Sequence, residues 1–373
     1  MAAGALSLVV PATMGYDAWA WMVWGRELAH LDLATTGGPS FKPLPVIVVA
    51  PLSILGGAAP AVWLAGMRAC AAASLVLGYR LGARLAGPAA GAVAVVGLAL
   101  SADLYRTALL GSAEPALIAV TLGAFDRHLD GRRDWALVLV AVAGLIRPEA
   151  WVVLAAYGAY VWLRDPHLRA LVAAAVLLPP ILWLGLDWAG SGDPLHAGST
   201  ATEATEGSAA QASVPALEVV RRAADAIIVP TLVLAAVGLV EAARRRDRRV
   251  LALAALAIAW IVVVAIMAEA GFTGTRRYLA APAAAICVVS GVGLAWLLAA
   301  VRRGPARTAA AGAVVALSLA PAFVRAREEG RTLSVARSQA HQLDELRRAV
   351  TKVGGAAAVR GVGRPAVNPW LQT

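Results

Sequence analysis

Residues 244–270 read RRRDRRVLALAALAIAWIVVVAIMAEA. The arginine cluster runs directly into an apolar segment of about the twenty residues that a helix needs to cross a bilayer. Clusters of this kind mark the ends of membrane helices that stay on the cytoplasmic side. The stretch therefore predicts a transmembrane helix whose first residues lie at the cytoplasmic surface.

The whole chain shares this apolar character. Of its 373 residues, 60% are hydrophobic and 15% charged, and the mean hydropathy is +0.71, which is far too apolar for a soluble globular domain. The net charge of +10 comes largely from arginines between apolar runs, so it indicates topology and argues against nucleic-acid binding. Cys70 and Cys287 lie inside apolar runs, and their spacing supports neither a disulfide framework nor a zinc site.

Extending outward from residues 244–270, we expect an all-α polytopic fold of about eleven crossings. The expected crossings are residues 1–15, 61–83, 88–104, 113–126, 134–147, 148–163, 169–188, 224–243, 250–270, 278–300 and 308–324. With the N-terminus in the cytoplasm, every inner loop carries an arginine cluster. Counting the proline-broken segment 43–55 as a crossing would reverse this pattern, so we expect it to be interfacial or re-entrant on the outer face. The expected domains are a membrane domain, 1–324, and a short extracytoplasmic tail, 325–373, with a helix near 334–350.

The first outer loop, 16–60, begins with an expected interfacial helix. Trp21, Trp24 and Leu28 recur at helical spacing, as in an amphipathic helix anchored by aromatic side chains. Asp17 stands at the start of this helix, where a carboxylate either caps the helix or serves a reaction.

Further ionisable residues are expected at the outer ends of crossings: Asp103, Arg106, Glu114, Arg147 and Glu149. Charged groups at such positions are costly, and each one is a candidate for function. Pairing that merely holds the helices together is the alternative.

Two later outer segments carry polar side chains. Asp193 and His196 open the long loop 189–222, which its small polar residues predict to be either a flexible lid or a plain connector. Arg276 and Arg277, followed by Tyr278, begin a helix on the outer side, where a basic pair suits a phosphate or a lipid headgroup.

Together these groups suit the transfer of a sugar from a lipid-phosphate carrier. A carboxylate would deprotonate an acceptor hydroxyl, and cations would stabilise the departing phosphate. No glycine-rich nucleotide-binding loop is evident in the sequence, so the donor is expected to be membrane-borne.

Several short motifs resemble the polyprenyl-phosphate-dependent glycosyltransferases of the C superfamily (GT-C). This superfamily includes protein O-mannosyltransferases, lipid A aminoarabinose transferases and arabinofuranosyltransferases. The resembling motifs occur in the family's order: Tyr16-Asp17-Ala18-Trp19, Lys42-Pro43-Leu44-Pro45, Gly111-Ser112-Ala113-Glu114-Pro115, Leu145-Ile146-Arg147-Pro148-Glu149, Gly192-Asp193-Pro194-Leu195 and Arg276-Arg277-Tyr278-Leu279.

The resemblance assigns roles to individual residues. It implies that Asp17 is the catalytic base, or a metal ligand in branches that use Mg or Mn, and that Glu114 is the second catalytic acid. It places Lys42, Arg147, Arg276 and Arg277 at the carrier phosphate. The supporting residues it implies are Tyr16, Arg106, Glu149, Asp193, His196 and Tyr278. The sequence departs from the family in two ways. Many members have two adjacent acidic residues in the first outer loop, whereas Asp17 has no acidic neighbour. Many also have a substantial soluble C-terminal domain, whereas the tail here is short.

The sequence thus predicts a multi-pass cell-membrane enzyme of the cell envelope with an extracytoplasmic active site. It would be an inverting glycosyltransferase, mannosyl- or arabinosyltransferase-like, that moves a sugar from a polyprenyl-phosphate donor to a glycan, lipid or protein acceptor. The alternatives are a transporter or flippase, which would favour paired interrupted helices in two halves, and a non-catalytic relative.

Overall fold

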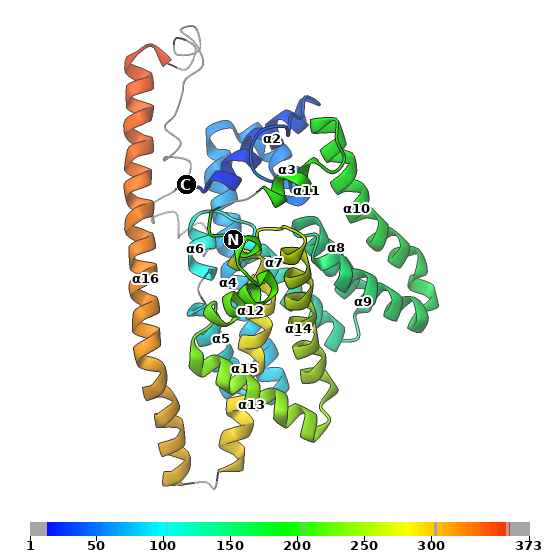
Figure 1. The fold of residues 1–373 in the computed structure, drawn as a ribbon, viewed down its shortest axis with the longest axis vertical. Coiled ribbons are helices and arrows are strands. Elements are labelled where there is room, and N and C mark those ends of the chain that lie inside the picture. Colours follow the sequence, from blue (N-terminus) through cyan, green and yellow to red (C-terminus); the bar gives the residue numbers. More distant parts are fainter. Residues whose placement is uncertain (1–12, 102, 204–205, 302–303, 356–357, 359–373) are drawn as a thin grey trace.

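The computed structural model describes residues 13–101, 103–203, 206–301, 304–355 and 358. Within these ranges every regular element is a helix. The expectation of an all-α polytopic membrane protein is therefore confirmed. Figure 1 shows a helical bundle with three short helices at one end and a long helix along its side: α2 (Tyr16–Ala29), α3 (Pro43–Leu52) and α11 (His196–Thr202) at the end, and α16 (Pro305–Lys352) at the side.

The helices follow the apolar segments of the sequence closely. Their bounds are α4 (Ala59–Ala86), α5 (Pro88–Ala99), α6 (Leu104–Leu109), α7 (Glu114–Leu129), α8 (Arg133–Ile146), α9 (Ala150–Arg164), α10 (Arg169–Ser191), α12 (Pro215–Asp225), α13 (Val229–Arg245), α14 (Arg248–Glu269) and α15 (Ala280–Ala300). Most of these begin or end within a few residues of the arginines and prolines that set the expected boundaries.

Helix α15 is the buried centre of the bundle. A Cβ atom added at Gly291 would lie 2.1 Å from the Ala90 carbonyl oxygen of α5, and one at Gly293 would lie 2.0 Å from the Leu234 carbonyl oxygen of α13. Glycine is therefore required at both positions, because any side chain would collide with the neighbouring backbone. In lipid the hydrophobic effect does not drive helices together, so such close backbone packing is what stabilises their association.

The part of the chain that the structure describes contains fewer helices that are long and apolar enough to cross a bilayer than the eleven crossings expected from the sequence. In the described ranges four helical segments are long and apolar enough to span a bilayer, and a fifth arises if α12 and α13, bent by 102°, are counted together. The four segments are Pro43–Ala86, Pro166–Ser191, Arg248–Glu269 and Arg276–Ala300. Several other expected crossings are shorter helices, such as α5 with 12 residues and α9 with 15. The number eleven stays a prediction, and most of the expected crossing at 1–15 lies outside the described residues.

The end of the bundle that the arginine pattern predicts to face outward is built from short elements. Helix α2 (Tyr16–Ala29) is followed by α3 (Pro43–Leu52) and then by a 3₁₀ segment, Ser53–Ala58, in which Gly56 adopts a φ of 52°. This break separates α3 from α4, and α3 packs against α2. The segment expected to be interfacial or re-entrant is thus a short helix, α3, joined through the 3₁₀ segment to α4 within the continuous apolar stretch Pro43–Ala86. Its position relative to the membrane stays a prediction.

Helix α16 (Pro305–Lys352) differs in extent from the expectation. It joins the expected last crossing and the expected tail helix into one helix of 48 residues, so no helix ends at the boundary expected after residue 324. It contacts α6, α13 and α15, and its Arg325 donates a hydrogen bond to the Asp225 carbonyl oxygen at the end of α12. The division into a membrane domain and a tail stays a prediction.

Candidate functional site

Two loop contacts bring Asp17 close to Glu114. The backbone N–H of Gly15, directly before α2, donates to the carbonyl oxygen of Leu110 at 2.9 Å. In the same turn Gly111 adopts a φ of +70°, and its carbonyl accepts a hydrogen bond from Trp63 Nε1 at 2.8 Å. The start of α2 is thus attached to the turn that precedes α7, which places Asp17 near Glu114.

An arginine from a distant part of the chain joins these two carboxylates. Arg277 donates from Nη2 to Asp17 Oδ2 at 2.5 Å and from Nε to Glu114 Oε1 at 3.1 Å. Lys42 Nζ lies 3.4 Å from the same Asp17 oxygen, and Arg147 donates to Glu114 Oε1. We call Asp17, Lys42, Glu114, Arg147 and Arg277 the outer ion cluster.

Aromatic side chains hold the cations in place. Trp260 Nε1 of α14 donates to the carbonyl oxygen of Tyr278 at 3.0 Å, which fixes the 3₁₀ turn Arg276–Leu279. The Arg147 guanidinium lies 4.4 Å from the centre of the Tyr278 ring, at cation–π distance. Arg147 is only 5% exposed, so its charge depends on these neighbours instead of on water.

The outer ion cluster has more positive than negative charge. Three cations face Asp17 and Glu114. Glu149, next to Arg147 in the chain, is buried, and neither carboxylate oxygen has a hydrogen-bond partner among the described residues. Glu149 also forms no ion pair with any of the three cations among the described residues. The site is therefore suited to an anion.

The pKa values of Asp17 and Lys42 reflect the balance between burial and the neighbouring charges. Burial alone would raise the pKa of Asp17, but Arg277 and then Lys42 more than offset it and hold the pKa well below its usual range. Burial, reinforced by the charge of Arg147, lowers the pKa of Lys42 to about 8. With Arg277 and Lys42 in place, Asp17 is a weak base, and Lys42 is a cation that can be neutralised at mild alkaline pH.

A cavity of about 660 Å³ opens beside the cluster, within the usual range for ligand pockets of about 300–1,000 Å³. Its walls come from α2, the 39–42 loop, the 147–151 turn, α10, α11 (His196–Thr202) and residues 206–208 and 267–278. The long outer loop packs onto the last of these segments through a hydrogen bond from Ala209 N to Thr273 O at 2.8 Å. The loop expected to be a lid or a connector therefore forms part of the cavity wall.

The predicted site residues divide into three groups. Tyr16, Asp17, Lys42, Arg147, Arg277 and Tyr278 line the cavity. Glu114 and Glu149 are buried close by, Glu114 in direct contact with the lining arginines. The remaining four, Arg106, Asp193, His196 and Arg276, are not among the lining residues. Their roles, like those of the lining residues, stay predictions.

The details of these four residues are informative. Asp193 accepts a hydrogen bond from the Leu195 backbone N–H at 2.9 Å and so stabilises its own turn. His196 begins α11, whose later residues do line the cavity. Arg106 and Arg276 are exposed, and both contribute positive charge near Asp103.

Asp187 is a cavity residue that the sequence reasoning missed. It is buried in α10 and lines the cavity, and its Oδ2 accepts a hydrogen bond from the Ala197 backbone N–H at 2.6 Å. Ser40 donates to the Ala197 carbonyl at 2.8 Å, so Asp187 helps to hold α11 against the first outer loop. The available signal was a lone carboxylate inside an apolar crossing, which is a candidate by default.

The surroundings of Asp17 do not fit a divalent metal. No group of three or more His, Cys, Asp or Glu side chains with metal-binding geometry occurs in the ranges that the structure describes. The groups nearest to the Asp17 carboxylate are Arg277 and Lys42, and two cations would repel Mg or Mn instead of completing its oxygen shell.

No protein-family model and no curated protein matches the chain. Among solved structures, it is similar to the crystal structure of ArnT from Cupriavidus metallidurans in the apo state, with a TM-score of 0.53 and 18% sequence identity. The match covers 91% of this chain and 72% of that chain. At this identity the likeness shows the fold, so the chain has the GT-C-like fold that its short motifs predicted.

Proposed function

We propose that this chain is a membrane glycosyltransferase that moves a sugar from a polyprenyl-phosphate donor to an acceptor hydroxyl at the outer face of the membrane. The observation that carries the proposal is the outer ion cluster: three cations and two carboxylates converge beside one cavity. The GT-C-like fold supports a glycosyltransferase in general. The donor follows from the charges.

The donor phosphate would occupy the side of the cavity lined by Lys42, Arg147 and Arg277. In the ligand-free protein these cations are partly neutralised by Asp17 and Glu114. A phosphate accepts charge-assisted hydrogen bonds from Arg and Lys at least as well as a carboxylate does. The incoming donor therefore competes with Asp17 for Arg277 and Lys42.

This competition prepares Asp17 for its proposed role. The pKa of Asp17 is low because Arg277 and Lys42 stabilise the carboxylate. When the donor phosphate draws these cations away, the pKa returns toward its ordinary range, and Asp17 becomes a better proton acceptor. Catalytic basicity would thus depend on donor binding.

The proposed transfer is a single inverting displacement. The acceptor oxygen attacks the anomeric carbon, the bond from that carbon to the phosphate oxygen breaks, and its electron pair stays on the polyprenyl phosphate. The acceptor proton passes to Asp17. Lys42, Arg147 and Arg277 stabilise the negative charge that develops on the leaving phosphate.

The test compares Asp17→Asn with Asp32→Asn, a carboxylate in the same outer loop that is exposed. Purified protein in lipid vesicles receives polyprenyl-phosphate donors carrying radiolabelled mannose, arabinose or aminoarabinose, together with a cell-envelope extract as acceptor. We expect Asp17→Asn to bind the donor but to lose about 10²–10⁴ of the transfer rate. We expect Asp32→Asn to transfer normally.

Other outcomes separate the alternatives. Normal transfer by Asp17→Asn would remove Asp17 as the base. Movement of intact labelled donor across the membrane, without transfer of the sugar, would favour a flippase. Absence of both activities with every donor in the wild-type chain would favour a non-catalytic relative.

A further inference from the structure

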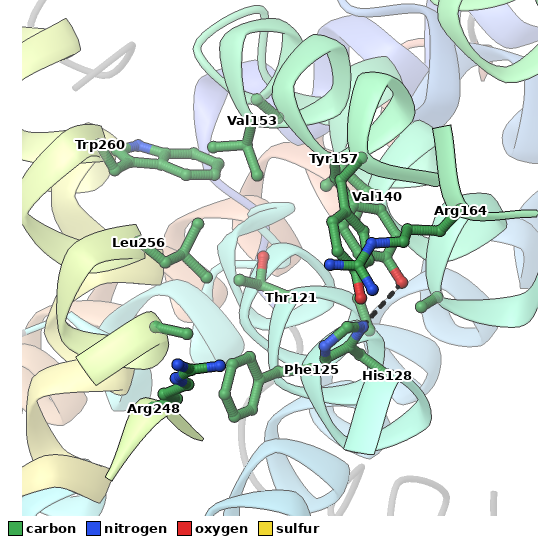
Figure 2. A pocket seen from close by; sticks show the side chains of 16 residues that line it. Thr121, Phe125, His128, Val140, Val153, Tyr157, Arg164, Arg248, Leu256 and Trp260 are labelled. Atoms are coloured by element: carbon green, nitrogen blue, oxygen red, sulfur yellow. Dashed lines mark hydrogen bonds between the residues drawn. The ribbon is translucent and has the colours of Figure 1, made fainter. Parts of the chain in front are cut away.

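A second cavity, with no lining residue in common with the first, extends along the helices from Ala150, beside Glu149, to Arg164 and Arg248 at their other end. It has a volume of about 510 Å³ and lies between α7, α8, α9 and α14. Most of its wall is apolar, formed by side chains such as Val140, Val153 and Leu256. Figure 2 shows these apolar side chains together with His128, Arg164 and Arg248, the basic ones.

The chain direction places these basic residues at one end of the cavity. Helices α7 and α9 begin near the outer ion cluster and end at His128–Leu129 and Arg164, and α14 runs the opposite way and begins at Arg248. Trp260, from the outer half of α14, lines the far end of the cavity and donates its indole hydrogen bond to Tyr278. Trp260 therefore stands between the two cavities.

The two arginines at this end are not neutralised by protein. Neither Arg164 nor Arg248 forms an ion pair with any residue in the described part of the chain. The neighbouring arginines differ in this respect: Arg133 contacts both oxygens of Asp165 at 2.8 Å, and Arg249 pairs with Asp247 at 3.0 Å. Arg164 and Arg248 are exposed and available to an external anion.

An apolar cavity with two arginines at its mouth that form no ion pair with the described residues is complementary to an anionic amphiphile. The apolar part of the ligand would lie between Val140, Val153 and Leu256, and its phosphate would lie against Arg164 and Arg248. Basic pockets between membrane helices on the cytoplasmic side bind phosphorylated headgroups, and the arginine clusters place this end in the cytoplasm.

We propose that this cavity binds an anionic glycerophospholipid of the cytoplasmic leaflet, with one acyl chain between α7, α8, α9 and α14 and its phosphate on Arg164 and Arg248. A donor tail reaching down from the outer cavity would need no cations at this end. The unpaired arginines therefore favour a separate lipid whose headgroup lies at the cytoplasmic end of the cavity. The site is independent of any sugar transfer.

The experiment uses the full chain in phosphatidylcholine nanodiscs doped with phosphatidylglycerol that carries a photoreactive diazirine on an acyl chain. After irradiation, mass spectrometry maps the labelled peptides. We expect labels on the peptides of α7, α8 and α14 that line the cavity. A phosphatidylcholine probe with the same acyl chain should label them far less.

Substitutions test whether Arg164 and Arg248 bind the lipid headgroup. We expect R164Q/R248Q to need about twentyfold more phosphatidylglycerol for equal labelling, because each arginine near an anionic lipid contributes roughly fivefold. R164K/R248K should keep most of the labelling. A252W, which fills the cavity and keeps both arginines, should lose it.

The matched control is R132Q/R244Q, which removes two exposed arginines from the same end of the bundle and should label as the wild type does. Equal loss in this control would overturn the proposal, since only bulk charge would matter. Equal labelling by the two probes would overturn the headgroup assignment. Displacement by unlabelled polyprenyl phosphate but not by unlabelled phosphatidylglycerol would show that the cavity holds a polyprenyl tail instead.

Discussion

The chain contains two ion clusters of almost the same composition, one at each end of α7. The outer ion cluster joins Asp17 and Glu114 to three cations. The inner ion cluster joins Asp126 and Asp130, at the end of α7, to Arg80, Arg84 and Arg127. The two clusters differ in the exposure of their cations: the arginines of the inner cluster are 32–52% exposed, whereas in the outer cluster Lys42 and Arg147 are 9% and 5% exposed and Arg277 is 30% exposed.

This difference separates a structural cluster from a candidate site. Water solvates the inner arginines, so their ion pairs with Asp126 and Asp130 add little beyond holding α4 against α7. Two of the outer cations, Lys42 and Arg147, have been removed from water, and the cost of burying a charge can exceed the gain from pairing it within the protein. Buried excess positive charge beside a cavity is explained by an anion that binds there.

The largest expected contrast is in catalysis. We expect Arg277→Ala to lower the transfer rate by about 10²–10³, the usual cost of removing one group that stabilises developing charge. We expect Arg84→Ala in the inner cluster to leave the rate within about twofold, because it lies outside the site. Initial rates in vesicles with a polyprenyl-phosphate donor measure both. Equal losses in the two variants would mean that the effect of Arg277 is structural.

The next contrast is in stability. Arg147→Ala removes the buried cation that pairs with Glu114, and breaking a buried pair costs about 3–5 kcal/mol. Arg127→Ala removes a half-exposed arginine, and we expect a cost of at most about 1 kcal/mol. Denaturant unfolding in the same detergent compares the two variants. Similar costs would show that burial does not distinguish the clusters.

The sequence predicted that five residues of the outer ion cluster share one side of the membrane, and the reason is the placement of arginine. Arginine placement fixed which ends of the crossings share a side, and that sidedness collected Asp17, Lys42, Glu114, Arg147 and Arg277, which the structure brings into contact. Charge placement carries this information because it sets topology before any packing is known.

The remaining details depend on local turns and on packing, which the pattern of charges does not encode. The 3₁₀ turn Arg276–Leu279 directs Arg277 to the carboxylates and leaves Arg276 exposed, and two adjacent arginines look alike in sequence. Asp187 was hidden inside an apolar crossing. Helix α16 continues through the residues expected to begin a tail, despite Pro321 in its interior.

The pH response provides a further contrast. Since the pKa of Lys42 is lowered to about 8, the charge of Lys42 is lost as the pH rises through this value, and donor affinity falls with it. We expect kcat/KM to decline above about pH 8. Lys42→Arg should remove this decline, since arginine stays protonated. A pH profile of both proteins measures the effect, and the same decline in both would exclude Lys42 as its cause.

The titration of Lys42 has the opposite effect on stability: activity is expected to fall as the pH rises above about 8, whereas the contribution of Lys42 to the free energy of unfolding is expected to rise. The pKa of Lys42 in the folded protein lies below its ordinary 10.5, so the unfolded chain binds more protons between about pH 8 and pH 10.5. The contribution of Lys42 to the free energy of unfolding therefore rises with pH in this window. The inner ion cluster, whose cations are all arginines, should contribute no such change.

The smallest contrast concerns salt. Asp130 is 26% exposed and pairs with Arg80, Arg84 and Arg127, so we expect Asp130→Asn to cost about 0.5 kcal/mol at low ionic strength. At about 1 M salt the screening length is about 3 Å, and the difference from wild type should vanish. The cost of Arg147→Ala should persist there, because no salt solution reaches a side chain that is 5% exposed. Measuring both variants at two salt concentrations tests whether exposure separates the clusters, and a cost of Arg147→Ala that falls with salt would place the outer cations in water and remove the reason to expect a bound anion.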